Sequence, residues 1–164
     1  MEIHATGLNR TLYQPYGDVI AGGMESKSAN AGTARRFDRL AALENLRAGA
    51  TPNLCLFRVE PAVANPFSVR MLERHRHSTQ VFIPMGSVSR YLVVVCGGGD
   101  APDLATLKAF VAEGAQGISY HPGTWHPPLI AFDRTTDFAC LVYEDGGAGD
   151  CEERALASVV SVAY

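Results

Sequence analysis

The sequence predicts a mainly β fold, a barrel or sandwich of short strands with one or two short helices. Apolar residues occur in short runs of about four to eight, and 16 Gly and 9 Pro residues punctuate them. With 47% apolar residues, a chain of 164 residues can bury a substantial core without disulfides or a structural metal. No internal repeat or low-complexity linker divides the chain, so we predict one domain over residues 1–164.

Ten segments have the length and composition of strands. Asn65-Pro66 marks a turn before one of them, and Gly97-Gly98-Gly99 marks a turn after another. In chain order the predicted strands are residues 16–20, 35–40, 53–59, 67–75, 80–84, 91–95, 116–120, 129–132, 138–143 and 159–162.

Two segments are predicted as helices. Residues 40–47 form the first. In the second, residues 104–113, the apolar side chains of Leu104, Leu107, Phe110 and Val111 repeat at helical spacing. Asp103 is expected to cap its start and Gly114 to end it.

Composition excludes several classes of partner. The formal net charge is -3, and no run of Lys or Arg provides the positive surface of a nucleic-acid binder. The longest strongly apolar run, residues 91–96, is far shorter than the roughly 20 residues of a membrane helix. The N-terminus lacks a signal peptide, and the four cysteines lack CxxC spacing. We therefore expect a cytoplasmic protein with free thiols and a small-molecule partner.

The strand that ends near residue 77 carries a candidate site. Alternate side chains of a strand share a face, so Glu73, His75 and His77 lie together while Arg74 and Arg76 point the other way. On the inward face of a small barrel, such a set needs pairing, a metal or a ligand to offset desolvation. The alternative is a polar strand face in solvent, which has no chemical role.

A second segment adds another imidazole. The sequence Tyr120-His121-Pro122-Gly123-Thr124-Trp125-His126 lies far along the chain. Together, HxH followed by Gln80 and later PGxxH resemble the two motifs of the cupin superfamily. In that pattern His75, His77, Gln80 and His126 would hold one divalent ion, and Ni, Zn, Fe and Mn all suit such ligands. His121 is a weaker candidate, and His4 has no supporting context.

A narrower resemblance covers most of the chain, from about Tyr13 to Asp145. Seven motifs occur in the order and spacing of the ureidoglycolate lyase family: YQPYGDVI (13–20), LERH (72–75), QVFIP (80–84), PDL (102–104), AF (109–110), GAQG (114–117) and YHPGTWHP (120–127).

The resemblance implies a cupin-like double-stranded β-barrel (jelly roll), a homodimer, and cleavage of ureidoglycolate to glyoxylate and urea in allantoin breakdown. It favours nickel as the metal, and no organic cofactor is expected. Arg76 and His77 replace the Pro and apolar residue usual in the family. Pro127 stands where a second His often follows. His77 either strengthens a metal site, as the general cupin pattern implies, or marks a subgroup with a changed substrate.

Cleavage of ureidoglycolate needs a base for its hydroxyl proton, an acid or electrophile for the urea nitrogen, and a cation for its carboxylate. His75 or His126 is a candidate base, and Glu73 either orients an imidazole or acts as the base in a dry site. A metal ion would lower the pKa of the hydroxyl. The carboxylate clamp stays open among four arginines, namely Arg35, Arg36, Arg58 and Arg70.

Two other functions remain open at this point. One is a different metal-dependent cupin enzyme, such as a dioxygenase or isomerase acting on a small carboxylic acid. Release of urea would separate that enzyme from the lyase. The other is a non-catalytic barrel that binds a metabolite, in which replacing His126 would weaken binding with no turnover to lose.

Overall fold

The computed structural model describes residues 1–23, 25–62, 64–86, 90–147 and 149–164. The prediction of a mainly β fold with short helices is confirmed. The helices are α1 (Arg10–Tyr13) and the 3-10 turns η1 (Asn30–Gly32) and η2 (Leu104–Thr106). The strands are β1 (Glu2–His4), β2 (Thr6–Gly7), β3 (Val19–Ile20), β4 (Lys27–Ala29), β5 (Ala34–Arg36), β6 (Thr51–Val59), β7 (Phe67–His75), β8 (Gln80–Pro84), β9 (Arg90–Val95), β10 (Lys108–Glu113), β11 (Gly117–Tyr120), β12 (Ile130–Ala131), β13 (Thr136–Glu144) and β14 (Cys151–Ala163).

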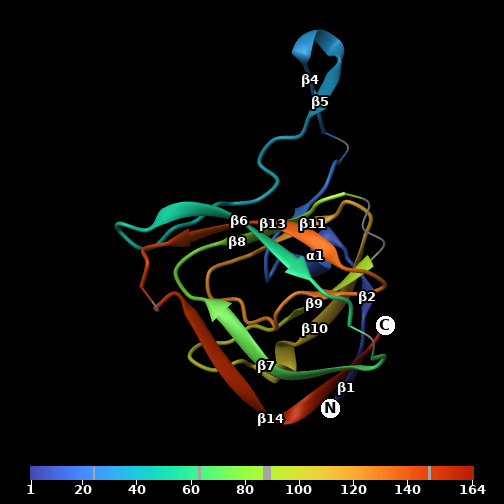
Figure 1. The fold of residues 1–164 in the computed structure, drawn as a ribbon, viewed down its shortest axis with the longest axis vertical. Coiled ribbons are helices and arrows are strands. Elements are labelled where there is room, and N and C mark those ends of the chain that lie inside the picture. Colours follow the sequence, from blue (N-terminus) through green and yellow to red (C-terminus); the bar gives the residue numbers. More distant parts are fainter. Residues whose placement is uncertain (24, 63, 87–89, 148) are drawn as a thin grey trace.

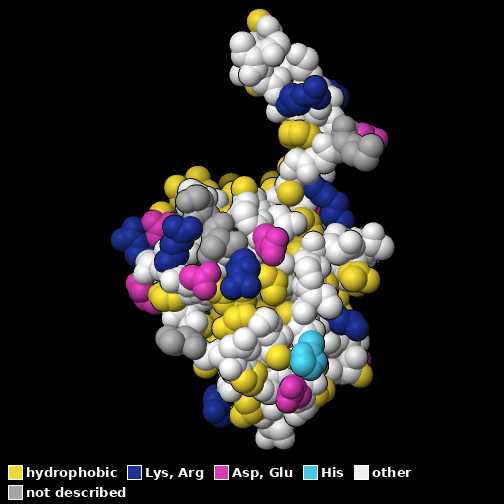
Figure 2. All heavy atoms as spheres, turned by 90° about the vertical axis from the view of Figure 1, so that its right-hand side faces the viewer, with side chains coloured by type: hydrophobic (Ala, Val, Ile, Leu, Met, Phe, Trp, Pro, Cys, Tyr) yellow, Lys and Arg dark blue, Asp and Glu magenta, His cyan; other side chains and the backbone are white. Residues whose placement is uncertain are grey.

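These strands form four sheets. Three make up the body of the molecule, in the orders β1-β14-β7, β12-β9-β10-β2 and β3-β11-β8-β13-β6. The fourth is the hairpin β4-β5, which projects from the body as an arm (Figure 1). Figure 2 shows Lys and Arg side chains on this arm, which stands clear of the rest of the chain. No helix in the described ranges is both long enough and apolar enough to cross a membrane.

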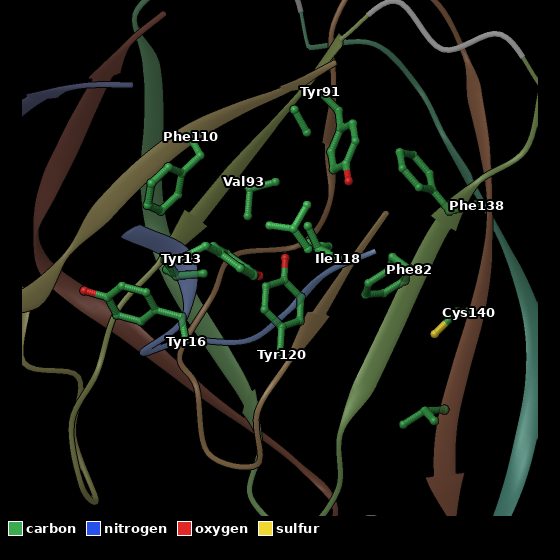
Figure 3. Close-up of a cluster of buried hydrophobic side chains, with 14 residues drawn as sticks. Tyr13, Tyr16, Phe82, Tyr91, Val93, Phe110, Ile118, Tyr120, Phe138 and Cys140 are labelled. Carbon is green, nitrogen blue, oxygen red and sulfur yellow. The ribbon is translucent and has the colours of Figure 1, made fainter. Parts of the chain in front are cut away.

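Strand β9 lies between two hydrophobic cores. Tyr91, Val93 and Val95 point into one core, where Figure 3 shows Tyr91 and Val93 beside several further side chains, most of them aromatic. Leu92 and Val94 point into the other core. A strand buried on both faces is apolar throughout, which accounts for the run at residues 91–96. Each fully buried side chain of this kind stabilises the fold by about 1.5–3 kcal/mol.

The predicted helix over residues 104–113 is wrong. Only η2 is helical there, with the Asp103 side chain accepting a hydrogen bond from the Ala105 amide. Residues Lys108–Glu113 instead form β10, which pairs with β9 along its whole length. Phe110 contributes to one core and Val111 to the other. The apparent helical spacing therefore came from a strand buried on both faces.

The predicted helix over residues 40–47 is also wrong. The segment is extended, and its polar groups bond to the turn between β7 and β8. The Leu46 amide donates to the His77 carbonyl at 2.8 Å, and the Thr79 amide donates to the Glu44 carbonyl at 3.0 Å. In a helix these amide and carbonyl groups would instead bond to residues four positions away in the same segment.

Most predicted strands lie where the sequence placed them. Strands β7 and β8 have the predicted bounds, while the segments at 16–20 and 35–40 contain only the short strands β3 and β5. The last strand is much longer than predicted, since β14 begins at Cys151. Strands β1, β2 and β4 and the helix α1 were not predicted.

A close backbone approach braces the segment that leads to His126. A Cβ on Gly17 would lie 1.8 Å from the Ser119 carbonyl oxygen, so only glycine fits there. Next to it, the Tyr16 carbonyl accepts hydrogen bonds from the His121 amide at 2.9 Å and the Thr124 hydroxyl at 2.8 Å. The N-terminal turn thereby fixes the course of residues 119–124.

Candidate active site

One pocket of about 350 Å³ contains three of the predicted catalytic residues. It opens between β6, β7, β8 and the ends of β11, β13 and β14. Its polar lining includes Glu73, His75, Gln80 and His126, and its walls are largely apolar. The remaining lining residues are Cys55, Phe57, Arg58, Val59, Phe82, Tyr120, Pro128, Leu129, Val142, Glu144 and Cys151.

The main chain brings Glu73 and His126 together. Their backbones form an isolated antiparallel bridge, with the Glu73 amide donating to the His126 carbonyl at 2.7 Å and the His126 amide donating to the Glu73 carbonyl at 2.8 Å. The carboxylate Oε1 of Glu73 lies 3.7 Å from Nε2 of His126. Two distant segments thus contribute one acid and one imidazole to a single position in the pocket.

His126 is held as a neutral imidazole. Its Nδ1 lies 2.9 Å from the Thr124 carbonyl oxygen, and because a carbonyl only accepts, Nδ1 is the donor. Its ring stacks on Tyr120 at a centroid distance of 3.8 Å. Burial lowers the pKa of His126 to about 3. Its Nε2 is buried without a hydrogen-bond partner, so this side chain presents an unused lone pair.

Glu73 is suited to exchange a proton. Burial of its half-buried carboxyl raises the pKa above the ordinary value, and the nearby His75 opposes part of that shift. A neighbouring thiol, Cys151 Sγ, lies 3.9 Å from Oε2 of Glu73. A carboxyl whose pKa rises toward neutrality is a better base than a surface glutamate.

His75 has a partner that sequence reasoning missed. Its Nδ1 lies 3.1 Å from Oδ2 of Asp150, the residue before β14. Its ring lies nearly parallel to that of His126, with centroids 6.2 Å apart. Asp150 has no local motif around it, and the only signal that would have found it is the pairing of β7 with β14, which sets Cys151 opposite His75.

The thiol of Cys151, which lines the pocket, is a poor nucleophile. Burial raises the pKa of Cys140, which pairs with Cys55 across β13 and β6, and burial also raises that of Cys151 to about 11. All four cysteines are free, and a protonated thiol does not attack a carbonyl.

The predicted metal ligands are brought together only in part. His75, Gln80 and His126 line the pocket, whereas His77 is not among its lining residues. In the described residues, no group of three or more His, Cys, Asp or Glu side chains is arranged to hold a metal ion. The donor chemistry nevertheless fits a divalent ion, since Gln80 Oε1 and His126 Nε2 are both buried without a hydrogen-bond partner.

Of the four candidate arginines, one lines the pocket. Arg58 does so, and it also pairs with both oxygens of Asp137 at 2.8 and 2.9 Å. Arg35 and Arg36 belong to the arm, and Arg70 is exposed on β7 outside the pocket lining.

Three other basic residues have structural partners. Arg74 faces away from Glu73, as the strand alternation predicts, and lies 4.5 Å from the centroid of the Trp125 ring. His121 lies 3.7 Å from Asp18, and His4 lies 3.8 Å from Glu2 on the surface.

The fold and the site together are typical of an enzyme that carries out acid–base chemistry on a small polar molecule. A carboxyl with a raised pKa faces a neutral imidazole, with a second imidazole beside them, in a pocket of a mainly β protein.

Comparison with known proteins gives the particular family. The family model described as ureidoglycolate lyase matches residues 1–163, so the chain belongs to the ureidoglycolate lyase family. The ureidoglycolate lyase of Burkholderia cepacia is 41% identical over 148 residues, which cover 89% of this chain and 81% of that protein. That of Salmonella typhimurium is 38% identical over 157 residues, which cover 95% of each chain. Among solved structures, a 3,4-ketoisomerase from Helicobacter canadensis matches with a TM-score of 0.44 and 14% identity, covering 83% of this chain and 89% of that one.

Proposed function

We propose that this protein is a ureidoglycolate lyase, which cleaves ureidoglycolate into glyoxylate and urea in the breakdown of allantoin. Membership of the family supports this reaction. The structural observation that carries it is the approach of the Glu73 carboxylate to within 3.7 Å of His126 inside a pocket of about 350 Å³. Such a pocket is of a size that suits a small metabolite.

The reaction is an elimination that needs only proton transfers. The hydroxyl of the substrate loses its proton, the carbon–nitrogen bond breaks as the aldehyde forms, and the leaving nitrogen gains a proton to give urea. Glu73 takes the hydroxyl proton, because burial raises its pKa and makes it a stronger base than an ordinary glutamate. His126 accepts a hydrogen bond through its free Nε2 and orients the substrate. Glu73 then passes this proton to the leaving nitrogen, while His75 accepts a hydrogen bond from the substrate.

Arg58 binds the carboxylate of the substrate in this proposal. It is the cation among the pocket-lining residues, and the pocket lining also includes Glu73 and Glu144. The negative charge of the substrate would be repelled there without a cation. Arg58 carries five donors, so it can serve Asp137 and a substrate carboxylate together.

A divalent ion, nickel by family resemblance, is part of the proposal. Gln80 Oε1, His126 Nε2 and His75 are the donors that would hold it, and the two imidazoles would then bind the ion in place of their hydrogen bonds to the substrate. When bound, such an ion lowers the pKa of a coordinated hydroxyl and neutralises a carboxylate. His77 is left out of this set because it does not line the pocket.

We further propose that the protein forms a homodimer in the cytoplasm. Strand β6 pairs only with β13, so it is an edge strand, and its Leu54 and Leu56 side chains are 75% and 52% exposed. Ile83 and Met85 extend this apolar surface. An exposed apolar edge and an isolated two-stranded arm both gain stability by contacting a partner. Sedimentation of the purified protein tests this directly, and a monomer at micromolar concentration would contradict it.

The test of function uses purified protein and racemic ureidoglycolate, with and without EDTA. Glyoxylate and urea are measured over time, against spontaneous breakdown as the background. We expect both products to appear at equal rates, and chelation followed by readdition of nickel measures the contribution of the metal. No acceleration over the background, in either metal state, would refute the lyase assignment.

A further inference from the structure

Asp150 contacts His75 from outside the pocket. The carboxylate Oδ2 lies 3.1 Å from Nδ1 of His75, and the two side chains are only 9% and 14% exposed. His75 lines the pocket, whereas Asp150 does not. Any effect of Asp150 on the substrate therefore passes through the imidazole.

Two further side chains hold Asp150 in this position. Arg47 Nη2 lies 3.2 Å from its Oδ1, and the Ser78 hydroxyl lies 3.4 Å from its Oδ2. The Arg47 side chain is itself only 16% exposed and also contacts Asp145 at 2.9 Å and the Tyr143 carbonyl at 3.2 Å. A buried carboxylate that keeps a cation on one oxygen and an imidazole on the other has little freedom to turn.

We propose that Asp150 is a positioning residue, which fixes a proton on Nδ1 of His75 and thereby presents Nε2 of this ring to the pocket. An ion-paired carboxylate only accepts hydrogen bonds, so Nδ1 must be the donor in this contact. This inference rests on the proposed function, because it states how one imidazole of that site is made ready to accept a hydrogen bond from the substrate or to bind a metal.

His126 reaches the same tautomer by a different route. Its Nδ1 donates to a backbone carbonyl, that of Thr124, which no side-chain substitution removes. The orientation of His75 depends on a side chain instead, so it can be changed without altering the ring itself. The two imidazoles of the pocket can therefore be separated by experiment.

The decisive variant is Asp150→Asn. Arg47 can only donate, so the amide oxygen of the new side chain must face Arg47, and its NH2 group must face His75 Nδ1. His75 then has to accept at Nδ1 and carry its proton on Nε2. Asp145→Asn is the matched control, because it removes the other carboxylate bound to the same arginine and leaves His75 untouched.

The tautomer is read by nitrogen-15 NMR of histidine-labelled, metal-free protein, with the His75 signals assigned by their absence in His75→Gln. We expect the Nδ1 proton in wild type and in Asp145→Asn, and the Nε2 proton in Asp150→Asn. A wild-type His75 with its proton on Nε2 would overturn the proposal even if the variant did not fold.

Kinetics provide the second readout. Asp150→Asn should lower kcat by about 10- to 100-fold with KM little changed, since partners of this kind act by orienting a group that touches the substrate. Asp145→Asn should stay within about twofold of wild type. Equal kcat values in the two variants would contradict the positioning role. If the wild type does not cleave ureidoglycolate, the proposed function fails, and the tautomer measurement still decides the role of Asp150.

Discussion

The buried imidazole of His126 makes the stability of the protein depend on pH in a way that needs no substrate to measure. Its pKa is about 3 in the folded protein against an ordinary value of 6.5, because burial penalises the charged ring and nearby His75 adds to the effect. The hydrogen bond to the Thr124 carbonyl opposes part of the shift. Between these two pH values only the unfolded chain takes up the proton, so acid favours unfolding.

The size of the effect follows from the shift. Above pH 6.5 neither state is protonated at this ring, and His126 makes no pH-dependent contribution. Below that value the free energy of unfolding falls by about 1.4 kcal/mol per pH unit. Between pH 7.5 and pH 5.0 the loss is about 2 kcal/mol, and it continues until the folded-state pKa is reached.

The assay is urea denaturation of metal-free protein at pH 7.5, 6.5, 5.5 and 5.0. The control variant His126→Asn places an amide near the position of Nδ1, where it can still donate to Thr124, and it does not titrate. We expect the stability advantage of wild type over the variant to shrink by about 2 kcal/mol from pH 7.5 to 5.0. A constant difference over this range would refute the buried, neutral state of His126.

Three further predictions concern single substitutions. Gly17→Ala should lower the free energy of unfolding, measured by urea denaturation, by at least about 3 kcal/mol, because the new Cβ would lie 1.8 Å from the Ser119 carbonyl oxygen. In the control Gly23→Ala the new Cβ meets no atom within 4 Å, so the free energy of unfolding should change by less than about 1 kcal/mol. Glu73→Gln should lower kcat by about 10²- to 10⁴-fold with an unchanged circular dichroism spectrum, and near-normal glyoxylate release would exclude Glu73 as the base. Arg58→Ala should raise KM by about 10- to 100-fold, and an unchanged KM would place the carboxylate elsewhere.

The fold was predictable from sequence wherever turn residues bounded a strand or one face of an element was buried. Strands β7 and β8 lie between clear turn signals and have the predicted bounds. The segment that became β10 was not predictable, because apolar residues needed by two cores mimic the spacing of an amphipathic helix. Whether such a run faces one core or two depends on its pairing with β9, which exists only in the tertiary structure. The extended course of residues 40–47 likewise depends on partners in a distant turn.

Strand alternation and motif spacing predicted part of the site from the sequence. Alternation along β7 correctly separated Glu73 and His75 from Arg74, and these two residues share a pocket with His126. His77 was placed by the same alternation, but β7 ends at His75 and the chain turns there, so the alternation no longer applies at His77. Asp150 was beyond reach, because its role depends on a long-range pairing and on Arg47 in a segment wrongly predicted as a helix.

The bridge between Glu73 and His126 is made by main-chain atoms, so the position of these residues does not depend on the side chains that carry the chemistry. Each residue holds the other through main-chain atoms, by two hydrogen bonds of 2.7 and 2.8 Å that every amino acid except proline can make. Either side chain can therefore be exchanged while the other keeps its place. This makes the pair suited to double-mutant cycles, in which the coupling energy reports on the side chains alone. Substitutions at these two positions can therefore change the chemistry of the pocket while the fold stays the same.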